Sequence, residues 1–168
     1  MTMRIPSVEE LREKLNYDPE TGALTWKKLR NSKRIGQQAK SIDVAGYIQV
    51  SFGTGCVHKG HRIAWAIHNG AWPVGPIDHV NGVRTDNRIE NLREVDHQTN
   101  CQNVRVGSMV NKSTGMLGVH LCKSNTNPYR AKIMFNGKQI HLGGYPTAEL
   151  AHAAYVEAKR RLHQGCTI

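Results

Sequence analysis

The alternation of apolar and polar residues predicts a chain built from short helices and strands. After a capping serine, apolar residues recur at helical spacing, which predicts a helix over 7–16. Alternating runs predict strands over 23–26 and 46–52. The run HRIAWAIHNG predicts a second helix over 61–70, ended by its glycine. The N-terminal part therefore predicts a small mixed unit.

The C-terminal part predicts a three-stranded antiparallel sheet. Strands are expected over 118–123, 129–135 and 138–145, and Asn136-Gly137 favours a hairpin between the last two. Strand periodicity places apolar residues on one face, namely Val119, Leu121, Tyr129, Ala131, Ile133, Phe135, Ile140 and Leu142. It places polar and basic residues on the other, namely His120, Arg130, Lys132, Gln139 and His141.

A helix follows this sheet, with Thr147 as its predicted N-cap and Gly165 just past its end. We expect its apolar stripe to cover the apolar face of the sheet and to leave the basic face free. The stripe consists of Leu150, Ala154, Ala158 and Leu162, flanked by Ala151 and Tyr155. We expect Lys159, Arg160 and Arg161 to form a solvated face of the helix.

The central segment predicts a strand, a loop, a second strand and a helix. A strand ends at Ile77, Asp78 and His79, and the second strand covers 92–95. Asp96 can then cap a helix that runs through Asn103. In such a unit Asn100 of the helix can face the loop that holds Asp78 and His79. Asn81 and Asn87 are interpreted as turn residues of that loop.

This set of side chains suits phosphodiester hydrolysis. Hydrolysis at neutral pH requires an activated water, and a neutral histidine such as His79 can take its proton. A hard divalent cation can neutralise the phosphoryl oxygens and the departing oxygen. Asp78 and Asn100 offer the oxygen ligands that such a cation prefers. Asn91 has an amide that can brace the loop from within by donating to and accepting from backbone groups.

Charge points to a polyanionic partner. Lys and Arg outnumber Asp and Glu by 23 to 13, for a net charge of +10 and a pI near 9.7. The excess is uneven: residues 1–72 carry 11 basic and 6 acidic side chains, 73–108 carry 4 and 5, and 109–168 carry 8 and 2. A near-neutral centre between basic flanks suits a metal-using site held on a phosphate backbone. A basic surface that only keeps the protein soluble remains an alternative.

The central segment, IDHVNGVRTDNRIENLREVDHQTNCQN, resembles the motif of HNH endonucleases, in the variant of phage and intron homing enzymes that ends in asparagine. The resemblance implies a ββα-metal centre in which Asp78 and Asn100 bind the metal. It also implies that His79 is the general base and that Asn91 braces the loop. The implied metal is a single Mg²⁺ or Mn²⁺ ion.

The C-terminal segment, roughly 112–165, resembles an AP2-type DNA-binding domain. GVHLCK, YRAKIMFNGKQIHLGGY and PTAELAHAAYVEAKRRLHQG correspond to its sheet and helix. AP2 domains lay their sheet in the major groove of DNA, which implies contacts from Arg130, Lys132, Gln139 and His141. Residues 1–72 resemble, more loosely, the N-terminal part of phage endonucleases of this kind.

The remaining basic residues are open to two interpretations. Arg84, Arg88, Arg93 and Arg105 can clamp phosphates or lie as solvated charges, and we favour Arg84 and Arg88 as DNA contacts because turns expose them. His61, Arg62 and His68 fall at helix ends, where we expect structural capping rather than metal or DNA binding.

Together these patterns predict an α+β protein in four parts. They are an N-terminal mixed DNA-contacting module (1–72), the HNH ββα-metal motif (73–106), a linker (107–115) and an AP2-like domain (116–168). We expect a monomeric, metal-dependent endonuclease that nicks one strand of double-stranded DNA at an extended site. A DNA-binding regulator that has lost catalysis is the alternative.

Other classes fit less well. A zinc-dependent nucleic-acid deaminase would need H-x-E with P-C-x-x-C, and neither is present. Because there is no apolar run of membrane-spanning length and no signal peptide, we expect no membrane association and a cytoplasmic location, in a bacterial host if a phage encodes the protein.

Overall fold

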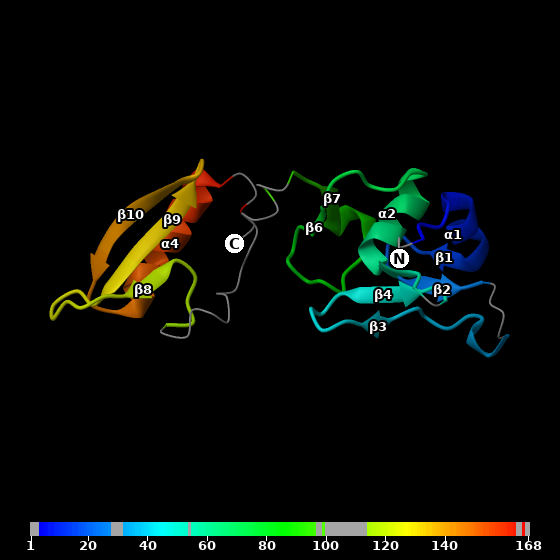
Figure 1. Ribbon diagram of the computed structural model, residues 1–168, viewed down its shortest axis with the longest axis horizontal. Helices are drawn as coiled ribbons and strands as arrows, with labels where there is room; N and C mark the ends of the chain where they lie inside the picture. Colours follow the sequence, from blue (N-terminus) through cyan, green and yellow to red (C-terminus); the bar gives the residue numbers. More distant parts are fainter. Residues whose placement is uncertain are drawn as a thin grey trace. The chain divides into compact units, whose positions relative to one another are not determined.

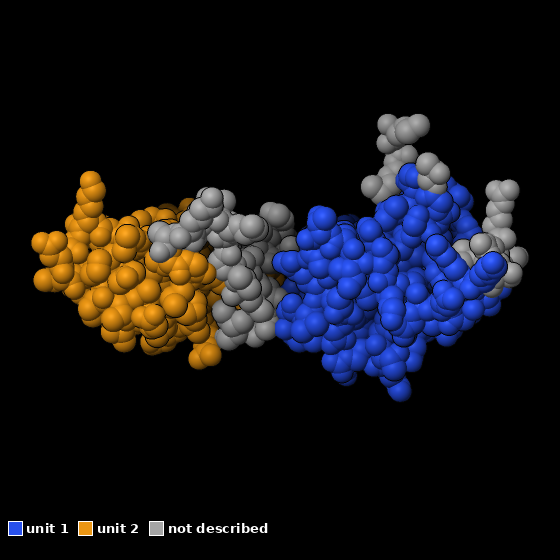
Figure 2. Space-filling model, turned by 90° about the horizontal axis from the view of Figure 1, so that it is seen from below, with its two compact units in different colours: residues 1–96 blue, residues 97–168 orange. Residues whose placement is uncertain are grey.

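The computed structural model describes residues 4–27, 32–53, 55–96, 99, 114–163 and 166. The chain divides into two compact units, residues 1–96 and 97–168, which Figure 2 distinguishes by colour. The first unit contains both the predicted N-terminal module and the strand pair of the central segment. Most of the predicted helix over 96–103, including Asn100, lies outside the described residues, as does most of the predicted linker.

The first unit is built from short elements (Figure 1). In chain order they are α1 (Val8–Lys14), β1 (Leu15–Tyr17), β2 (Leu24–Trp26), the 3-10 turn η1 (Ser32–Arg34), β3 (Ser41–Ile42), β4 (Ile48–Ser51), β5 (Val57–Lys59), α2 (Gly60–Asn69), β6 (Ile77–His79), the 3-10 turn η2 (Ile89–Asn91) and β7 (Leu92–Glu94). The strands form three antiparallel sheets, β1-β2, β3-β4-β5 and β6-β7. The mixed helix-and-strand character predicted for this part is confirmed.

Helix α1 begins as predicted but ends earlier. The Ser7 hydroxyl accepts a hydrogen bond from the Glu10 backbone N–H, 3.2 Å away, and so caps the helix. The predicted end at residue 16 is wrong, because Leu15 takes an extended conformation (φ −127°, ψ 145°). Leu15 instead starts β1 and pairs with Trp26 of β2, and both side chains are buried. Packing of the sheet therefore overrides the helical periodicity at this position.

Helix α2 connects the two hydrophobic cores of the unit. Ile63 and Ala66 belong to the larger core, which also contains residues of α1, β1, β2 and β4. Ala64, on another side of the helix, packs with Ile77 of β6 and Leu92 of β7. Burying one aliphatic side chain stabilises a fold by about 1.5–3 kcal/mol, so α2 holds the β6-β7 hairpin firmly. The helix ends at Gly70, in the left-handed region (φ 77°), as predicted.

The second unit is a three-stranded antiparallel sheet packed on one helix (Figure 1), which confirms the predicted fold class. Its elements are β8 (Val119–Leu121), β9 (Tyr129–Phe135), β10 (Lys138–Tyr145) and α4 (Ala148–Leu162), with β9 in the centre. The β9-β10 turn has positive φ at both Asn136 (49°) and Gly137 (73°), as predicted for an Asn-Gly hairpin. The Thr147 hydroxyl caps α4 by accepting from Leu150 N–H.

The face that α4 presents to the sheet differs from the predicted stripe. Ala151, Tyr155 and Ala158 are buried, whereas Leu150 is 51 % exposed, because the helix is rotated relative to the i, i+4 stripe of the sequence. The Tyr155 ring occupies the position that a side chain would take at Gly118, since a Cβ there would lie 1.9 Å from the ring. On the sheet, Leu121 is 56 % exposed and does not join the apolar face.

Lys159 also contradicts its predicted place on a solvated face. It is 1 % exposed, and its ammonium group lies 5.9 Å from the centre of the Tyr155 ring. Arg160 and Arg161 are exposed, as predicted. The rotation of α4 that exposes Leu150 brings Lys159 inward next to Tyr155.

Candidate active site

The β6-β7 hairpin carries Asp78 and His79 at adjacent positions. In its register Asp78 lies opposite Arg93, and His79 lies opposite Leu92. Neighbouring residues on a strand point to opposite faces, so the two side chains enter different surroundings. Asp78 meets β7, whereas His79 meets the first turn of α2 and the loop between the strands.

Asp78 is paired with a cation. The residue is 8 % exposed, and Oδ2 accepts hydrogen bonds from Arg93 Nη2 (2.9 Å) and Nε (3.1 Å). Such charge-assisted contacts fix the orientation of a carboxylate. Sequence reasoning left Arg93 open between a phosphate contact and a surface charge, and the structure places it on Asp78.

His79 lies in a pocket of rings and one amide. It is 4 % exposed, its ring centre lies 5.0 Å from that of His61 and 5.9 Å from that of Tyr47, and its Nε2 lies 3.2 Å from Asn87 Oδ1. Burial lowers the pKa of His79, while the contact with Asn87 and the charge of Asp78 act in the opposite direction. The imidazole is therefore neutral at pH 7 and can accept a proton.

His61 is not a helix-capping residue, contrary to its interpretation from sequence. It is 7 % exposed, packs edge-on against His79 and also contacts the Tyr47 ring at 5.2 Å. Burial, followed by the nearby His79, lowers the pKa of His61 to about 3. His61 lies three residues before Ala64, on the same side of the helix, so the helical pattern could have predicted that it faces the core. Nothing in the sequence predicted that it would contact His79.

Arg62, from the same helix turn, holds the segment that leads into β6. Its Nη1 donates to Gly75 O and its Nη2 to Pro73 O, each at 2.8 Å. His68, which was also expected to cap a helix end, is exposed near the end of α2. Arg62 thus positions the hairpin from outside, and helix capping does not describe its role.

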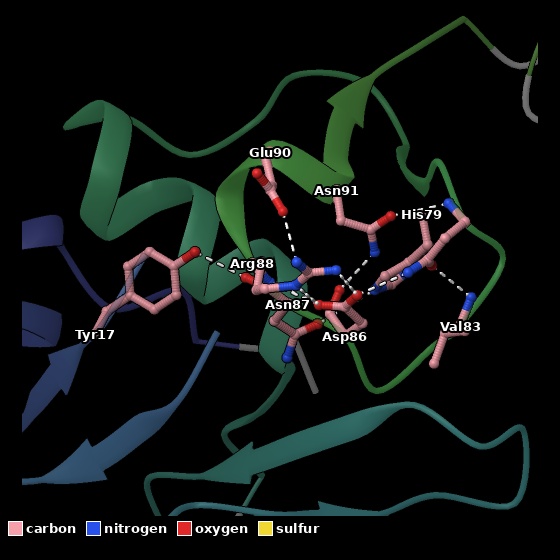
Figure 3. A network of polar contacts seen from close by, with 9 residues as sticks. Tyr17, His79, Val83, Asp86, Asn87, Arg88, Glu90 and Asn91 are labelled. Atoms are coloured by element: carbon pink, nitrogen blue, oxygen red, sulfur yellow. Dashed lines mark hydrogen bonds and ion pairs between the residues drawn. The ribbon is translucent and has the colours of Figure 1, made fainter. Parts of the chain in front are cut away.

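Asn91 bridges the loop between the strands (Figure 3). Its Nδ2 donates to Asp86 O, and its Oδ1 accepts from Asn81 N–H, both at 2.8 Å. The side chain is 5 % exposed. These are the donor and acceptor contacts to backbone groups that were predicted for Asn91 from the sequence.

Asp86 is the charged centre of this loop. Its carboxylate accepts from Asn81 Nδ2 (2.7 Å) and from the Nε and Nη2 of Arg88 (2.9 and 2.8 Å). Hydrogen bonds from Arg88 are the largest cause that lowers the pKa of Asp86 to about 2. Arg88 also donates to Glu90 at 2.6 Å, so two carboxylates hold its guanidinium within the loop (Figure 3).

Asn81 and Asn87 received the same interpretation from sequence but differ in the structure. Asn81 Oδ1 accepts from Val83 N–H at 2.8 Å, the contact of a turn-forming asparagine, which confirms the prediction. Asn87 is 1 % exposed and its amide faces His79, so its interpretation as a simple turn residue is wrong. The motif DNRIENL gave no signal that would separate the two.

Arg84 lies on the exposed part of the same loop. Its guanidinium is 5.0 Å from the centre of the Tyr47 ring, and Nη1 donates to Ala45 O at 2.6 Å. Lys59 lies over the same ring at 5.0 Å and pairs with Asp43. Two cations therefore gather at Tyr47, whose ring also contacts His79.

The described residues offer few oxygen ligands for a hard divalent cation. Among the residues that the structure describes, no group of three or more His, Cys, Asp and Glu side chains could hold a metal ion. Asp78 supplies one buried carboxylate, and Asn100 lies outside the described residues. Mg²⁺ commonly binds one or two carboxylates and completes its shell with waters and phosphate oxygens.

The sheet of the second unit presents the polar face predicted for it. Arg130, Gln139 and His141 are exposed and Lys132 is partly exposed. Lys132 lies directly opposite His141 on the neighbouring strand, and Arg130 lies opposite His120 of β8. The helix covers the other face, which leaves these side chains on the open side of the sheet.

Residues 58–102 match the family model described as HNH endonuclease. The matched range begins in β5, includes α2 and both strands of the hairpin, and contains Asp78, His79, Asn91 and Asn100. The match supports a nuclease of the HNH type. Comparison with curated proteins and with solved structures found no significant match.

None of the helices that the structure describes combines the length and the apolar character needed to cross a bilayer.

Proposed function

We propose that this protein is a metal-dependent DNA endonuclease of the HNH homing type, which hydrolyses phosphodiester bonds in double-stranded DNA and nicks one strand. The observation that carries the proposal is the environment of His79. Its imidazole is buried, has a lowered pKa and follows the Asp78 carboxylate within the HNH-matched range. Metal-assisted hydrolysis can use a neutral histidine as the general base and a carboxylate as a metal ligand.

In this proposal His79 is the general base. It takes one proton of a water as the water oxygen forms a bond to phosphorus. The bond from phosphorus to the leaving oxygen breaks, and the leaving oxygen keeps the electron pair and is protonated by solvent. Base catalysis of this kind contributes typically 10²- to 10⁴-fold to a rate.

Asp78 and Asn100 are the proposed ligands of a divalent ion, Mg²⁺ or Mn²⁺. When bound, the ion supplies positive charge to the phosphoryl and leaving oxygens. Arg93 keeps the Asp78 carboxylate in a fixed direction through two hydrogen bonds to Oδ2. Asn91 braces the loop, so that His79 and Asp78 keep a constant relation at the hairpin.

DNA binding is proposed for two surfaces. The open face of the second unit would contact DNA as an AP2-type sheet, through Arg130, Lys132, Gln139 and His141. In the first unit Arg84 and Arg88 are the proposed phosphate contacts. Arg84 is the stronger candidate, because two carboxylates already hold Arg88. A monomer with one site and these surfaces would act on an extended, asymmetric target.

A DNA-binding regulator without catalysis is the second candidate. The Asp78-Arg93 pair favours it, because an arginine can replace a metal ion as the partner of a buried carboxylate. The two candidates differ in one assay. Supercoiled DNA is incubated with the protein, with and without Mg²⁺ or Mn²⁺, and nicked and linear products are followed over time. Metal-dependent nicked circles support the nuclease, linear product formed at the same rate contradicts nicking, and binding without cleavage supports the regulator.

A further inference from the structure

Asn87 is an unusually buried asparagine for a turn-rich loop. Only 1 % of it is exposed, and its Oδ1 lies 3.2 Å from Nε2 of His79. An amide oxygen only accepts hydrogen bonds, so the imidazole nitrogen facing it has to carry the proton. A neutral imidazole has one protonated nitrogen, which leaves the lone pair of His79 on Nδ1.

Three other segments hold Asn87 in place. The Tyr17 hydroxyl donates to Asn87 O at 2.7 Å (Figure 3), and burial raises the pKa of Tyr17 to about 12, so this donor keeps its proton at neutral pH. A Cβ at Gly22 would lie 2.5 Å from Arg88 N and 2.6 Å from the carbonyl carbon of Asn87. A Cβ at Gly60 would lie 3.0 Å from Asn87 Nδ2. Two glycines and a tyrosine therefore enclose the residue.

Asn87 also lines a small cavity. Asn87 Nδ2 is buried without a hydrogen-bond acceptor among the described protein atoms. Asn87 lines a cavity of about 30 Å³ together with Gln38, Lys40 and Ile48. This exceeds the ~10–15 Å³ that one buried water needs. The cavity beside Asn87 is therefore large enough to hold one water.

We propose that Asn87 is a positioning residue for His79, which holds the imidazole in the Nε2–H tautomer and so makes Nδ1 the atom that takes the proton of the attacking water. The catalytic consequence rests on the proposed nuclease function. The tautomer of His79 does not, and it can be measured in the absence of DNA and metal.

The first test measures that tautomer in the complete wild-type chain. Long-range ¹H–¹⁵N correlation spectra at neutral pH distinguish the two ring nitrogens, and the signals of His79 are assigned by their loss in His79→Gln. A protonated Nε2 with an unprotonated Nδ1 is the expected result. A protonated Nδ1 overturns the proposal, and this measurement does not depend on the folding of any Asn87 variant.

The second test separates positioning from folding. Asn87→Leu removes the acceptor, and we expect the single-turnover cleavage rate to fall by about 10- to 100-fold, the usual effect of removing an orienting partner. The dissociation constant for DNA should stay unchanged, and His79 should populate both tautomers. Asn87→Asp keeps an oxygen acceptor and should restore most of the rate.

Val50→Ala is the control for stability, because it creates a cavity in the larger core, which does not include His79. Asn87→Leu with the wild-type rate and an intact Nε2–H tautomer overturns the proposal. If the wild-type protein does not cleave DNA, the proposed nuclease function fails, and the spectrum of His79 still decides the role of Asn87.

Discussion

Arg93 places two nitrogens on a single oxygen of Asp78, with Nη2 and Nε at 2.9 and 3.1 Å from Oδ2, at directly opposed positions of β6 and β7. The proposed metal ligand is therefore already paired with a cation of the protein. The guanidinium of Arg93 and a metal ion bound to Asp78 would repel each other. Removing Arg93 should therefore strengthen metal binding if Asp78 is a metal ligand, and should not change it if the two residues form only an ion pair.

Arg93→Met should lower the free energy of unfolding by about 1–3 kcal/mol, because the buried Asp78 carboxylate loses the two hydrogen bonds that Arg93 donates to it. Mg²⁺ or Mn²⁺ should then raise the melting temperature more in the variant than in the wild type, since the site becomes more negative. Thermal denaturation with and without millimolar metal measures both effects. The control is Arg12→Met, because the Arg12 guanidinium donates to Ile67 O. This variant should show the same rise in melting temperature with metal as the wild type. Equal metal responses in all three proteins would remove Asp78 as a metal ligand.

Asn91→Ala should loosen the loop, because Asn81 N–H and Asp86 O lose their partner. Leaving such groups unpaired costs about 1–3 kcal/mol. The direct measurement is hydrogen exchange at the Asn81 amide, which should become faster in the variant. Asn91→Asp keeps the acceptor for this amide and should preserve more of the protection. Unchanged exchange in Asn91→Ala would show that the bridge does not order the loop.

Lowering the pH should destabilise the first unit already at pH values above those at which carboxylates titrate. The pKa of His61 is about 3 in the folded protein, below the ordinary value of 6.5, because the ring is buried and lies near His79, Arg62 and Lys59, with Asp43 opposing them. Between these values the unfolded chain binds more protons, so the stabilisation is complete above 6.5 and is lost as pH falls toward 3.

The melting temperature should therefore fall between pH 7 and pH 5, and His61→Phe should flatten this dependence. His68→Gln, a change at an exposed position of the same helix, should leave it as in the wild type. A pH dependence that His61→Phe does not alter would show that His61 is not a buried neutral residue.

Replacing Arg130 and Lys132 together by alanine should weaken DNA binding and flatten its salt dependence. Each lost phosphate contact removes about one unit of the log–log slope. Arg160 and Arg161, which are also exposed, provide a control with the same loss of charge on α4. Binding curves over a series of salt concentrations give both slopes. Equal slopes for the two double variants would contradict a DNA contact by the sheet.

The sequence predicted those parts of the fold that depend on local patterns. The Asn136-Gly137 turn, the Thr147 cap and the Gly70 helix end all follow from the conformations available to one or two residues. The predicted end of α1 was wrong because Leu15 pairs with Trp26, a tertiary contact that competes with the local helical pattern. The place of Lys159 was wrong because the rotation of α4 depends on Tyr155 filling the space over Gly118.

The candidate site was predictable where it lies within one short segment. Asp78, His79 and Asn91 are close in sequence, and the hairpin register keeps them together. His61 and Tyr17 come from distant segments, and they reach His79 and Asn87 only because α2 and β1 pack beside the loop. Asn81 and Asn87 look alike in the sequence, since both are asparagines of a turn-rich loop. Only the burial of Asn87 in the folded protein distinguishes their roles.

The most direct test of the central claim compares cleavage and binding in the wild type, His79→Ala and Asp78→Ala. Each protein is incubated with supercoiled DNA and Mg²⁺, and its affinity for the same DNA is measured without metal. We expect nicking by the wild type alone, with similar affinities for all three proteins. Nicking by His79→Ala at the wild-type rate would show that the buried imidazole has no part in the chemistry.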